Sequence, residues 1–407
     1  MHRSLKPVQK GLLYLTYHEN VLRTGILHTQ VVRMLQKLGE LGSLKKIVLL
    51  SFLSPQSLWK DRQRIPQFKQ TMAESGVTVV LLPMLFPAKW SYPASLLIFL
   101  WAVPTYFVAL FTGCRIVHSR GYPAALLART VSHFLDLRTV FDPRGPYPDE
   151  MVMNSIWEKG SYTELFWKSF ESMLISNSDA VIGVTSEFRD EFLHRGAKRS
   201  IFVPNRTDVS AFGEGREAFR LQGQSRDGVE MLFIGELHSV WNDPGLVGRH
   251  FIGLSRQFPE ARLRLITTAN PQKALETLES GGVDITRVTF ESRRPAEMPF
   301  AMQGATFGLI FRAVNIHSLW SVKIAEYLAA GIPLIVDKTM VGLPVKIIRE
   351  KLLGVVIDPD NPADYEQLDQ IVKDWPEWSE RCVRYAERRL DLRSTARQHL
   401  RLYRSFT

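Results

Sequence analysis

The sequence "SVKIAEYLAAGIPLIVD", Ser321 to Asp337, predicts one helix that turns directly into one buried strand. Helix-forming residues run from Val322 to Ala330, and Gly331 stands where a helix commonly ends in a left-handed residue. Lys323 and Glu326 interrupt the apolar helical half. They are consistent either with an i,i+3 surface ion pair or with two groups that bind a ligand.

Similar strand-like runs recur along the whole chain, separated by segments of helix length. The first series begins at Gly11, Lys45, Val77, Arg115, Leu137, Asp179 and Ile201, and the second at Met231, Ala261, Arg287, Thr306, Pro333 and Gly354. Continuous apolar runs are typical of strands buried on both faces, and strand–helix alternation indicates βαβ units. The sequence therefore predicts an α/β fold with two Rossmann-like, doubly wound parallel-sheet domains. Their ligand site is expected beyond the carboxyl ends of the strands, in the cleft between the domains.

The interval between the two series of strand-like runs suggests the domain boundary. The stretch Glu214–Glu230 is polar and glycine-rich without a strand signal, so it is interpreted as a linker. The predicted domains are residues 1–212, residues 213–380, and a C-terminal helix, 381–407, that packs back on the first domain.

The C-terminal stretch from Glu377 to Phe406 has a long helical pattern. Its arginines recur at every fourth position, at Arg389, Arg393, Arg397 and Arg401. Such a stripe is consistent with a solvated helix face, or with a face directed at a membrane or another domain.

Composition limits the functional classes. The chain has 407 residues, a formal net charge of +10 and two cysteines without metal-ligand spacing. The positive charge favours an anionic partner such as a nucleotide phosphate or an acidic membrane surface. Nucleic acid is not expected, because no zinc-finger, RNP-like or basic-aromatic motif is present. The few cysteines and the absence of a secretory h-region before His18 favour a cytoplasmic protein.

An uncharged run, Ala94–Phe111, precedes the fourth strand and contains Pro104. It stands where a crossover helix belongs, and a true membrane span would place neighbouring strands on opposite sides of the bilayer. It is therefore expected either in the core or as a monotopic anchor, whose outer face, with Trp90, Trp101 and Tyr106, enters the membrane interface.

The helix that starts at Val322 follows the strand near Thr306, so its N-terminus lies at the carboxyl edge of the second sheet. Free N–H groups and the positive end of the helix dipole favour a phosphate there. A lysine in the first turn opposes the dipole unless an anion neutralises both. Glu326, one turn on, is placed to accept hydrogen bonds from a ribose diol.

With these residues in place, the chain resembles GT-B-fold glycosyltransferases of family 4, whose donor signature is S-P-x-K-x-x-E-Y-L-A-A-G-x-P-V-I. Other segments resemble the family in the same order: "RTGILHTQVVRMLQKLGELG", "HSRGYPAALLA", "VFDPRGPYPDE", "SDAVIGVTSEFRDEF", "FVPNRTDVSAF" and "LDLRSTARQHLRLYRSF". The resemblance spans nearly the whole chain.

On the donor side, the resemblance implies a nucleotide diphosphate sugar held by residues of both domains. Glu326 would bind the ribose, while Ser321, Val322 and Lys323 would hold the diphosphate. Gly25, in the loop after the first strand, would allow close backbone approach. Arg293 is placed to contact the base.

On the acceptor side, the resemblance implies that His118 contacts the sugar and that Asp142 and Arg144 line the site. From the residues alone, His118 is equally consistent with a satisfied sheet-edge histidine, and Asp142 and Arg144 with a mutual ion pair. Asn205 and Arg206 are interpreted as shaping a turn.

The chain departs from the family at two places. Ser318 stands where many members have a second glutamate, and Glu236 replaces an arginine of the usual phosphate clamp, which Lys323 and Arg312 would have to supply. The resemblance implies transfer of a hexosyl-type group with retention, to a lipid-linked or cell-envelope glycan at the inner membrane face. No metal or other cofactor is expected. The alternatives are a GT-B nucleotide-sugar epimerase and a non-catalytic nucleotide-sugar-binding relative.

Overall fold

A computed structural model of the chain describes residues 10–23, 25, 27–84, 95–223, 228–237, 241–267, 270–312 and 320–406. The chain divides into two compact units, Met1–Pro204 with Leu392–Thr407, and Asn205–Asp391. We call them unit 1 and unit 2 and describe each by itself. Trp90, Ala94 and Ser318 lie outside the described residues.

Unit 1 is built on a seven-stranded parallel sheet in the order β3-β2-β1-β4-β5-β6-β7. Its strands are β1 (Gly11–Tyr17), β2 (Ile47–Leu53), β3 (Val77–Pro83), β4 (Cys114–Arg120), β5 (Arg138–Asp142), β6 (Ala180–Gly183) and β7 (Ser200–Phe202). Its helical elements are η1 (His28–Arg33), α1 (Met34–Glu40), α2 (Pro55–Lys60), η2 (Arg62–Arg64), α3 (Ile65–Glu74), η3 (Leu97–Trp101), α5 (Ala102–Thr112), α6 (Tyr122–Val131), α7 (Tyr147–Met153), α8 (Tyr162–Asn177), α9 (Ser186–His194) and α18 (Leu392–Arg404).

Unit 2 has a six-stranded parallel sheet in the order β10-β9-β8-β11-β12-β13. Its strands are β8 (Glu230–Ile234), β9 (Arg262–Ile266), β10 (Val288–Glu291), β11 (Phe307–Ile310), β12 (Leu334–Asp337) and β13 (Gly354–Ile357). Its helical elements are α10 (Val209–Leu221), α11 (Pro244–Gln257), α12 (Pro271–Ser280), η4 (Ile285–Arg287), η5 (Pro295–Glu297), α13 (Met298–Ala301), α14 (Val322–Ala330), α15 (Leu343–Glu350), η6 (Pro362–Glu366), α16 (Gln367–Lys373) and α17 (Trp375–Arg389). All thirteen predicted strands are confirmed, because every predicted apolar run contributes a strand to one of the two sheets.

Alternate strand residues supply the two apolar layers of each unit. In unit 2, Leu232 and Val336 pack with α14 and α17, while Phe233 and Leu265 pack with α11 and α16 on the opposite face. Side chains that alternate across a doubly covered sheet bury both faces, which explains the continuous apolar runs in the sequence.

Two predicted boundaries are wrong. The stretch interpreted as a linker begins with the second half of α10, residues 214–221, and this helix buries Val209 and Phe212 in the core of unit 2. Gly215 is needed for packing, since a Cβ there would lie 2.0 Å from the carbonyl oxygen of Pro299. Because α10 is polar on average, its composition gave no indication of this buried face.

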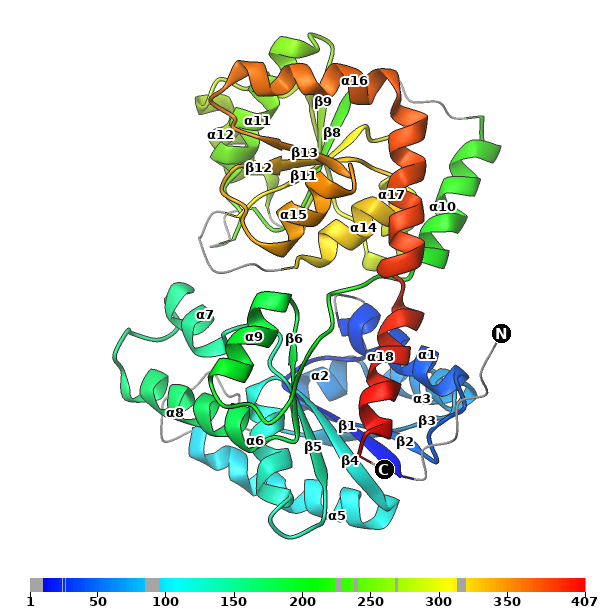
Figure 1. Cartoon of the computed structure of the whole chain (residues 1–407), viewed down its shortest axis with the longest axis vertical. Coiled ribbons are helices and arrows are strands. Elements are labelled where there is room, and N and C mark those ends of the chain that lie inside the picture. The colour runs from blue at the N-terminus through cyan, green and yellow to red at the C-terminus, as the bar shows by residue number, and fades with distance from the viewer. Residues whose placement is uncertain are drawn as a thin grey trace. The chain divides into compact units, whose positions relative to one another are not determined.

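The predicted single C-terminal helix is two helices. α17 ends at Arg389, the carbonyl oxygen of the following Leu390 accepts a hydrogen bond from Thr207 N, and Asp391 bridges to Thr207. The arginine stripe is therefore divided: Arg389 lies on α17, and the other three arginines lie on the exposed side of α18. Figure 1 shows α18 in red beside α1, on the sheet of unit 1.

The uncharged run before β4 folds as η3 and α5, and Pro104 causes no break because it lies in the first turn of α5. Ile98, Thr105 and Ala109 are buried while much of the opposite side is exposed. Across the described ranges, none of the helices combines the length and the apolar character needed to traverse a lipid bilayer.

Candidate functional site

The N-terminus of α14 lies at the carboxyl edge of the unit 2 sheet, because α14 follows β11 in the chain. Tyr327 fixes the helix against the sheet: its hydroxyl donates to Leu232 O at 3.1 Å and accepts from Ile234 N at 3.0 Å. The ring lies against Gly308 of β11, where a Cβ would come within 2.5 Å of it. The tyrosine of the "EYLAAG" stretch and the glycine of β11 therefore act together to position the helix.

Ser321 caps α14 by accepting a hydrogen bond from Lys323 N at 3.3 Å. Ile324 N donates to the carbonyl oxygen of Ser321 at 3.2 Å, so the first N–H groups of the helix are those left for a ligand, as at any helix start. Lys323 Nζ lies 3.1 Å from Glu326 Oε2, and both side chains are only partly exposed. The predicted residues Ser321, Val322, Lys323 and Glu326 are thus adjacent at one helix end.

Asn205 supports the approach to this helix. Its side-chain amide donates to the carbonyl oxygen of Trp320, the residue before the cap, at 2.7 Å. Sequence reasoning gave Asn205 only a turn-shaping role, and the structure adds a contact that fixes the backbone entering α14.

The two predicted arginines of unit 2 lie at different distances from α14. Arg312 follows β11 at the same sheet edge, and its guanidinium lies 5.1 Å from the ring centroid of Trp241. Arg293 follows β10, the outermost strand, and pairs with Glu291 at 2.9 Å. Three strand spacings separate β10 from β11, roughly 14 Å. The structure therefore groups Arg312, and not Arg293, with the helix end.

In unit 1, His118, Asp142 and Arg144 lie together at the carboxyl ends of β4 and β5. Asp142 Oδ2 is 3.3 Å from Arg144 Nη1 and 3.6 Å from His118 Nε2, the latter longer than a hydrogen bond. Arg144 has a φ of 67°, uncommon for a residue other than glycine. The ion pair considered for Asp142 and Arg144 is present in the structure.

His118 has no exposed surface. Its ring stacks on Tyr14 at 4.5 Å between centroids, and it meets the ring of His399 edge to face with centroids 5.0 Å apart. Nδ1 is 2.6 Å from the hydroxyl of Tyr403 on α18. The C-terminal helix therefore covers His118, and the sugar contact implied by the resemblance stays a prediction that this arrangement does not favour.

Three further residues complete this cluster and were missed by sequence reasoning. Arg120 Nε pairs with Glu19 at 3.0 Å, and Gln30 Oε1 accepts from both Arg120 and Arg144 at 2.8 Å. Arg120 belongs to the quoted "HSRG" segment, so a signal existed for it. Glu19 and Gln30 had none, because only the fold brings them to β4.

Burial and charge set the protonation states of this cluster. Burial lowers the pKa of His118, and the opposing effect of Asp142 is too small to restore it, so the ring is neutral near pH 7. Burial alone would raise the pKa of Asp142, but Arg144, His118 and Arg120 together hold it below its usual range. Asp142 thus favours the proton on His118 Nε2, and Tyr403 donates its hydroxyl hydrogen to Nδ1.

Gly25 lies between β1 and η1, and its carbonyl oxygen accepts from His28 N at 3.0 Å. No atom lies within 4 Å of a Cβ built there, so no described part of the chain requires glycine at this position. The role expected for Gly25, close approach of the backbone to a ligand, therefore concerns the ligand and not the packing of the chain.

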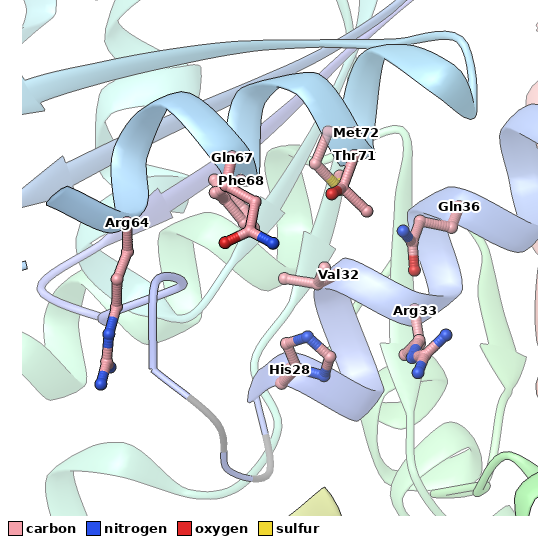
Figure 2. A pocket seen from close by; sticks show the side chains of 9 residues that line it. All are labelled: His28, Val32, Arg33, Gln36, Arg64, Gln67, Phe68, Thr71 and Met72. Carbon is pink, nitrogen blue, oxygen red and sulfur yellow. The ribbon is translucent and has the colours of Figure 1, made fainter.

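A pocket of about 340 Å³ lies beside this loop, between η1–α1 and α3. Figure 2 shows His28, Arg33 and Gln36 on one side of it and Arg64, Gln67 and Thr71 on the other. None of the predicted site residues lines it. Among the described residues, no group of three or more histidine, cysteine or acidic side chains is arranged to hold a metal ion.

Comparison with protein families identifies a match to the first half of the chain. The profile described as "Glycosyl transferase 4-like domain" matches residues 29–206, which cover most of unit 1. Residues 29–206 form a region that resembles this domain. It contains His118, Asp142 and Arg144, whereas α14 lies outside it. A comparison with curated protein sequences finds no match.

Solved structures resemble the chain over nearly its full length. Sucrose-phosphate synthase from Thermosynechococcus elongatus has a TM-score of 0.68 at 15% identity, covering 98% of this chain and 99% of that one. HepE from Anabaena, in complex with UDP and glucose, has a TM-score of 0.62 at 14% identity, covering 98% and 100%. A trehalose-6-phosphate structure from E. coli, bound with UDP-2-fluoro glucose, has a TM-score of 0.63 at 12% identity, covering 96% and 98%.

These similarities confirm the GT-B fold of two Rossmann-like domains and the resemblance to family-4 glycosyltransferases. The sequence predicts a glycosyltransferase, and the family profile that matches residues 29–206 describes the same class of enzyme. Two clusters thus stand out: the helix end in unit 2, and the buried polar cluster in unit 1.

Proposed function

We propose that the chain transfers a hexosyl-type group from a nucleotide diphosphate sugar to a lipid-linked or cell-envelope glycan acceptor, with retention of configuration. The observation that carries the proposal is the Lys323–Glu326 pair at the N-terminal end of α14, held at the sheet edge by Tyr327 and Gly308. A diphosphate joined to a ribose requires a cation for its phosphates and a carboxylate for its ribose hydroxyls, and both groups are present at this helix N-terminus.

The donor is proposed to bind at α14. The diphosphate accepts hydrogen bonds from first-turn N–H groups near Ser321 and Val322 and takes Lys323 as its cation. Glu326, released from Lys323, accepts hydrogen bonds from the ribose hydroxyls. Stabilising the departing diphosphate in this way is the main catalytic contribution that we assign to unit 2.

On the acceptor side we assign the contact role to Arg144 and Asp142. The Arg144 side chain is 21% exposed, whereas His118 is buried, so Arg144 is the more accessible group. His118 is proposed to position Asp142, and Gln30 to hold the Arg120 and Arg144 guanidinium groups. The formal net charge of +10 favours anionic ligands at both the donor site and the acceptor site.

UDP-sugars are the first donors to test, because HepE binds UDP and glucose and the E. coli neighbour binds UDP-2-fluoro glucose. We also propose that the protein is cytoplasmic, works at the inner membrane face, and needs neither a metal nor another cofactor. Turnover is therefore expected to persist in EDTA.

The test is a thermal-shift screen of nucleotide diphosphate sugars, followed by turnover assays with and without membrane lipid extract. The proposal predicts stabilisation by at least one nucleoside diphosphate and its sugar, and transfer that requires an acceptor. Turnover of the donor alone would identify an epimerase, and binding without any turnover would identify a non-catalytic relative. No stabilisation by any nucleoside diphosphate would refute the donor site.

A further inference from the structure

The exposed outer side of η3 and α5 is apolar along its whole length. Six large side chains on it are exposed: Leu97, Leu100, Val103, Phe107, Leu110 and Phe111. They recur at spacings of three and four residues and so share one helix face, opposite the buried Ile98, Thr105 and Ala109. We call this face the apolar strip. Soluble proteins rarely expose such a contiguous set of large apolar side chains without a partner.

The apolar strip does not end at α5. Phe99 of η3 contacts Phe170 of α8, with ring centroids 6.2 Å apart, and the Phe170 ring is tilted against Phe166 with centroids 4.6 Å apart. Leu165 of α8 is 55% exposed, and Tyr162 at the start of that helix is 83% exposed. The helical elements η3 and α8, which are distant in sequence, are therefore in contact through apolar rings.

The end of α5 leads to the amino ends of the strands. Phe111 is 79% exposed, and Gly113, with a φ of 66°, turns the chain into β4. Phe134, which precedes β5, is 74% exposed at the same edge of the sheet. Phe111 and Phe134, both largely exposed, therefore lie at the amino edge of the unit 1 sheet.

The same edge carries a row of cations. The strand register aligns Ile47, Leu12, Ile116 and Arg138, so the residues just before them share one edge. Exposed cations stand there at Lys45, Lys46, Arg115, Lys198 and Arg199, which we call the basic row. Carboxylates at this edge are Glu74, Asp136 and Asp179, and Asp179 already pairs with Arg138 at 3.1 Å. The basic row thus carries a net positive charge.

We propose that the apolar strip and the basic row together bind an anionic lipid bilayer, with the strip entering the interface and the row contacting headgroup phosphates. Aromatic and leucine side chains beside cations match the depth profile of a membrane interface. A second copy of the chain fits less well, because a two-fold contact across the strip would place the two basic rows close together. The proposal rests on the proposed function only in that both place the protein at a membrane, since Asp142 and Arg144 lie at the carboxyl ends of the strands and the basic row lies at their amino edge.

Both parts are expected to contribute measurably. Each lysine near an anionic surface contributes about 1 kcal/mol, or about fivefold in binding. Lys45→Gln with Lys46→Gln should therefore weaken binding about 25-fold at low salt, and the loss should shrink in about 1 M salt. Phe107→Ser with Phe111→Ser should weaken it about tenfold or more, because both rings lose apolar burial in the interface.

The test is co-sedimentation with phosphatidylcholine vesicles, with and without phosphatidylglycerol, in the absence of any nucleotide. The matched control is Leu193→Ser with Leu221→Ser, two exposed leucines on α9 and α10. The proposal predicts binding to the anionic vesicles, lost in both strip and row variants and kept in the control. All these positions are exposed, so folding, checked by circular dichroism, should be retained.

The proposal is overturned if the strip variant binds vesicles as well as the parent chain does. It is also overturned if the parent sediments as a dimer that the strip variant converts to a monomer, because the strip is then a subunit interface. Nucleotide binding, measured without vesicles, is independent of either result, so the donor site and the membrane surface can fail separately.

Discussion

Replacing Glu326 by glutamine separates a ligand-binding role from a structural one. The substitution keeps the shape of the side chain but removes its charge, so it weakens the 3.1 Å contact with Lys323. An i,i+3 pair on a helix contributes about 0.3 to 0.5 kcal/mol, and a partly exposed pair rarely more than about 1 kcal/mol. For a unit of this size, 1 kcal/mol corresponds to about 2–4 °C in Tm. The expected loss of Tm is therefore below about 4 °C.

The expected loss of donor affinity is much larger. Hydrogen bonds to a charged acceptor contribute about 1.5–3 kcal/mol, and the ribose would lose such bonds to the Glu326 carboxylate. Since about 1.4 kcal/mol is a factor of ten, the Kd of a nucleoside diphosphate should rise about 10- to 100-fold. Isothermal titration calorimetry with UDP, or with the nucleotide that stabilises the chain most, measures this change directly.

Glu350→Gln on α15 is the matched control, because Glu350 pairs with Lys346 within a helix of the same unit, 3.8 Å away. It should change neither Kd nor Tm appreciably. The reasoning is refuted if Glu326→Gln lowers Tm by much more than 4 °C while the Kd stays unchanged, since Glu326 then acts only within the protein.

Three further predictions concern the fold around the site. Tyr403→Phe removes the donor to buried His118 Nδ1 and should lower the free energy of unfolding by about 1–3 kcal/mol in urea titrations; an unchanged midpoint would contradict the contact. Burial lowers the pKa of His118, so below about pH 6.5 the unfolded chain binds more protons than the folded one. The free energy of unfolding should therefore decrease as the pH is lowered below about 6.5. A His118→Gln variant should show a shallower fall in Tm, and an equal fall would exclude this histidine as the cause. Gly215→Ala should destabilise unit 2 by about 1–3 kcal/mol because of the clash with Pro299 O, whereas Gly213→Ala on the same helix, with 3.7 Å of room, should stabilise it by about 0.5–1 kcal/mol; equal effects would contradict the packing of α10.

The strands were predictable because parallel strands buried on both faces leave an unmistakable apolar run. "IVLLSFL" at β2 is buried at every position, as expected of a parallel strand covered on both faces. The helix after β11 was equally clear, since Gly331 has a φ of 78° at its end. Local chemistry decides such features, so a single sequence reveals them.

The linker and the C-terminal helix were mispredicted because tertiary contacts override local composition. α10 is polar on average, yet its buried face depends on α13 lying against Gly215. The break between α17 and α18 depends on Thr207, far away in sequence. Neither contact leaves a periodic signal at the place where it acts.

Part of the candidate site could be predicted and part could not. The motif around α14 is contiguous, so Lys323 and Glu326 were found together. The unit 1 cluster joins Glu19, Gln30 and Arg120 from separate segments, and a single sequence does not indicate which distant polar residues meet. The covering of His118 by Tyr403 depends in the same way on where the last helix packs.

The most direct test of the donor site is hydrogen–deuterium exchange of the chain with and without a saturating nucleoside diphosphate. The account predicts slower exchange of the first-turn amides of α14, Val322 to Ala325, with no comparable change at the start of α15. Binding confirmed by calorimetry together with unchanged exchange at α14 would contradict it, because the diphosphate would then lie elsewhere.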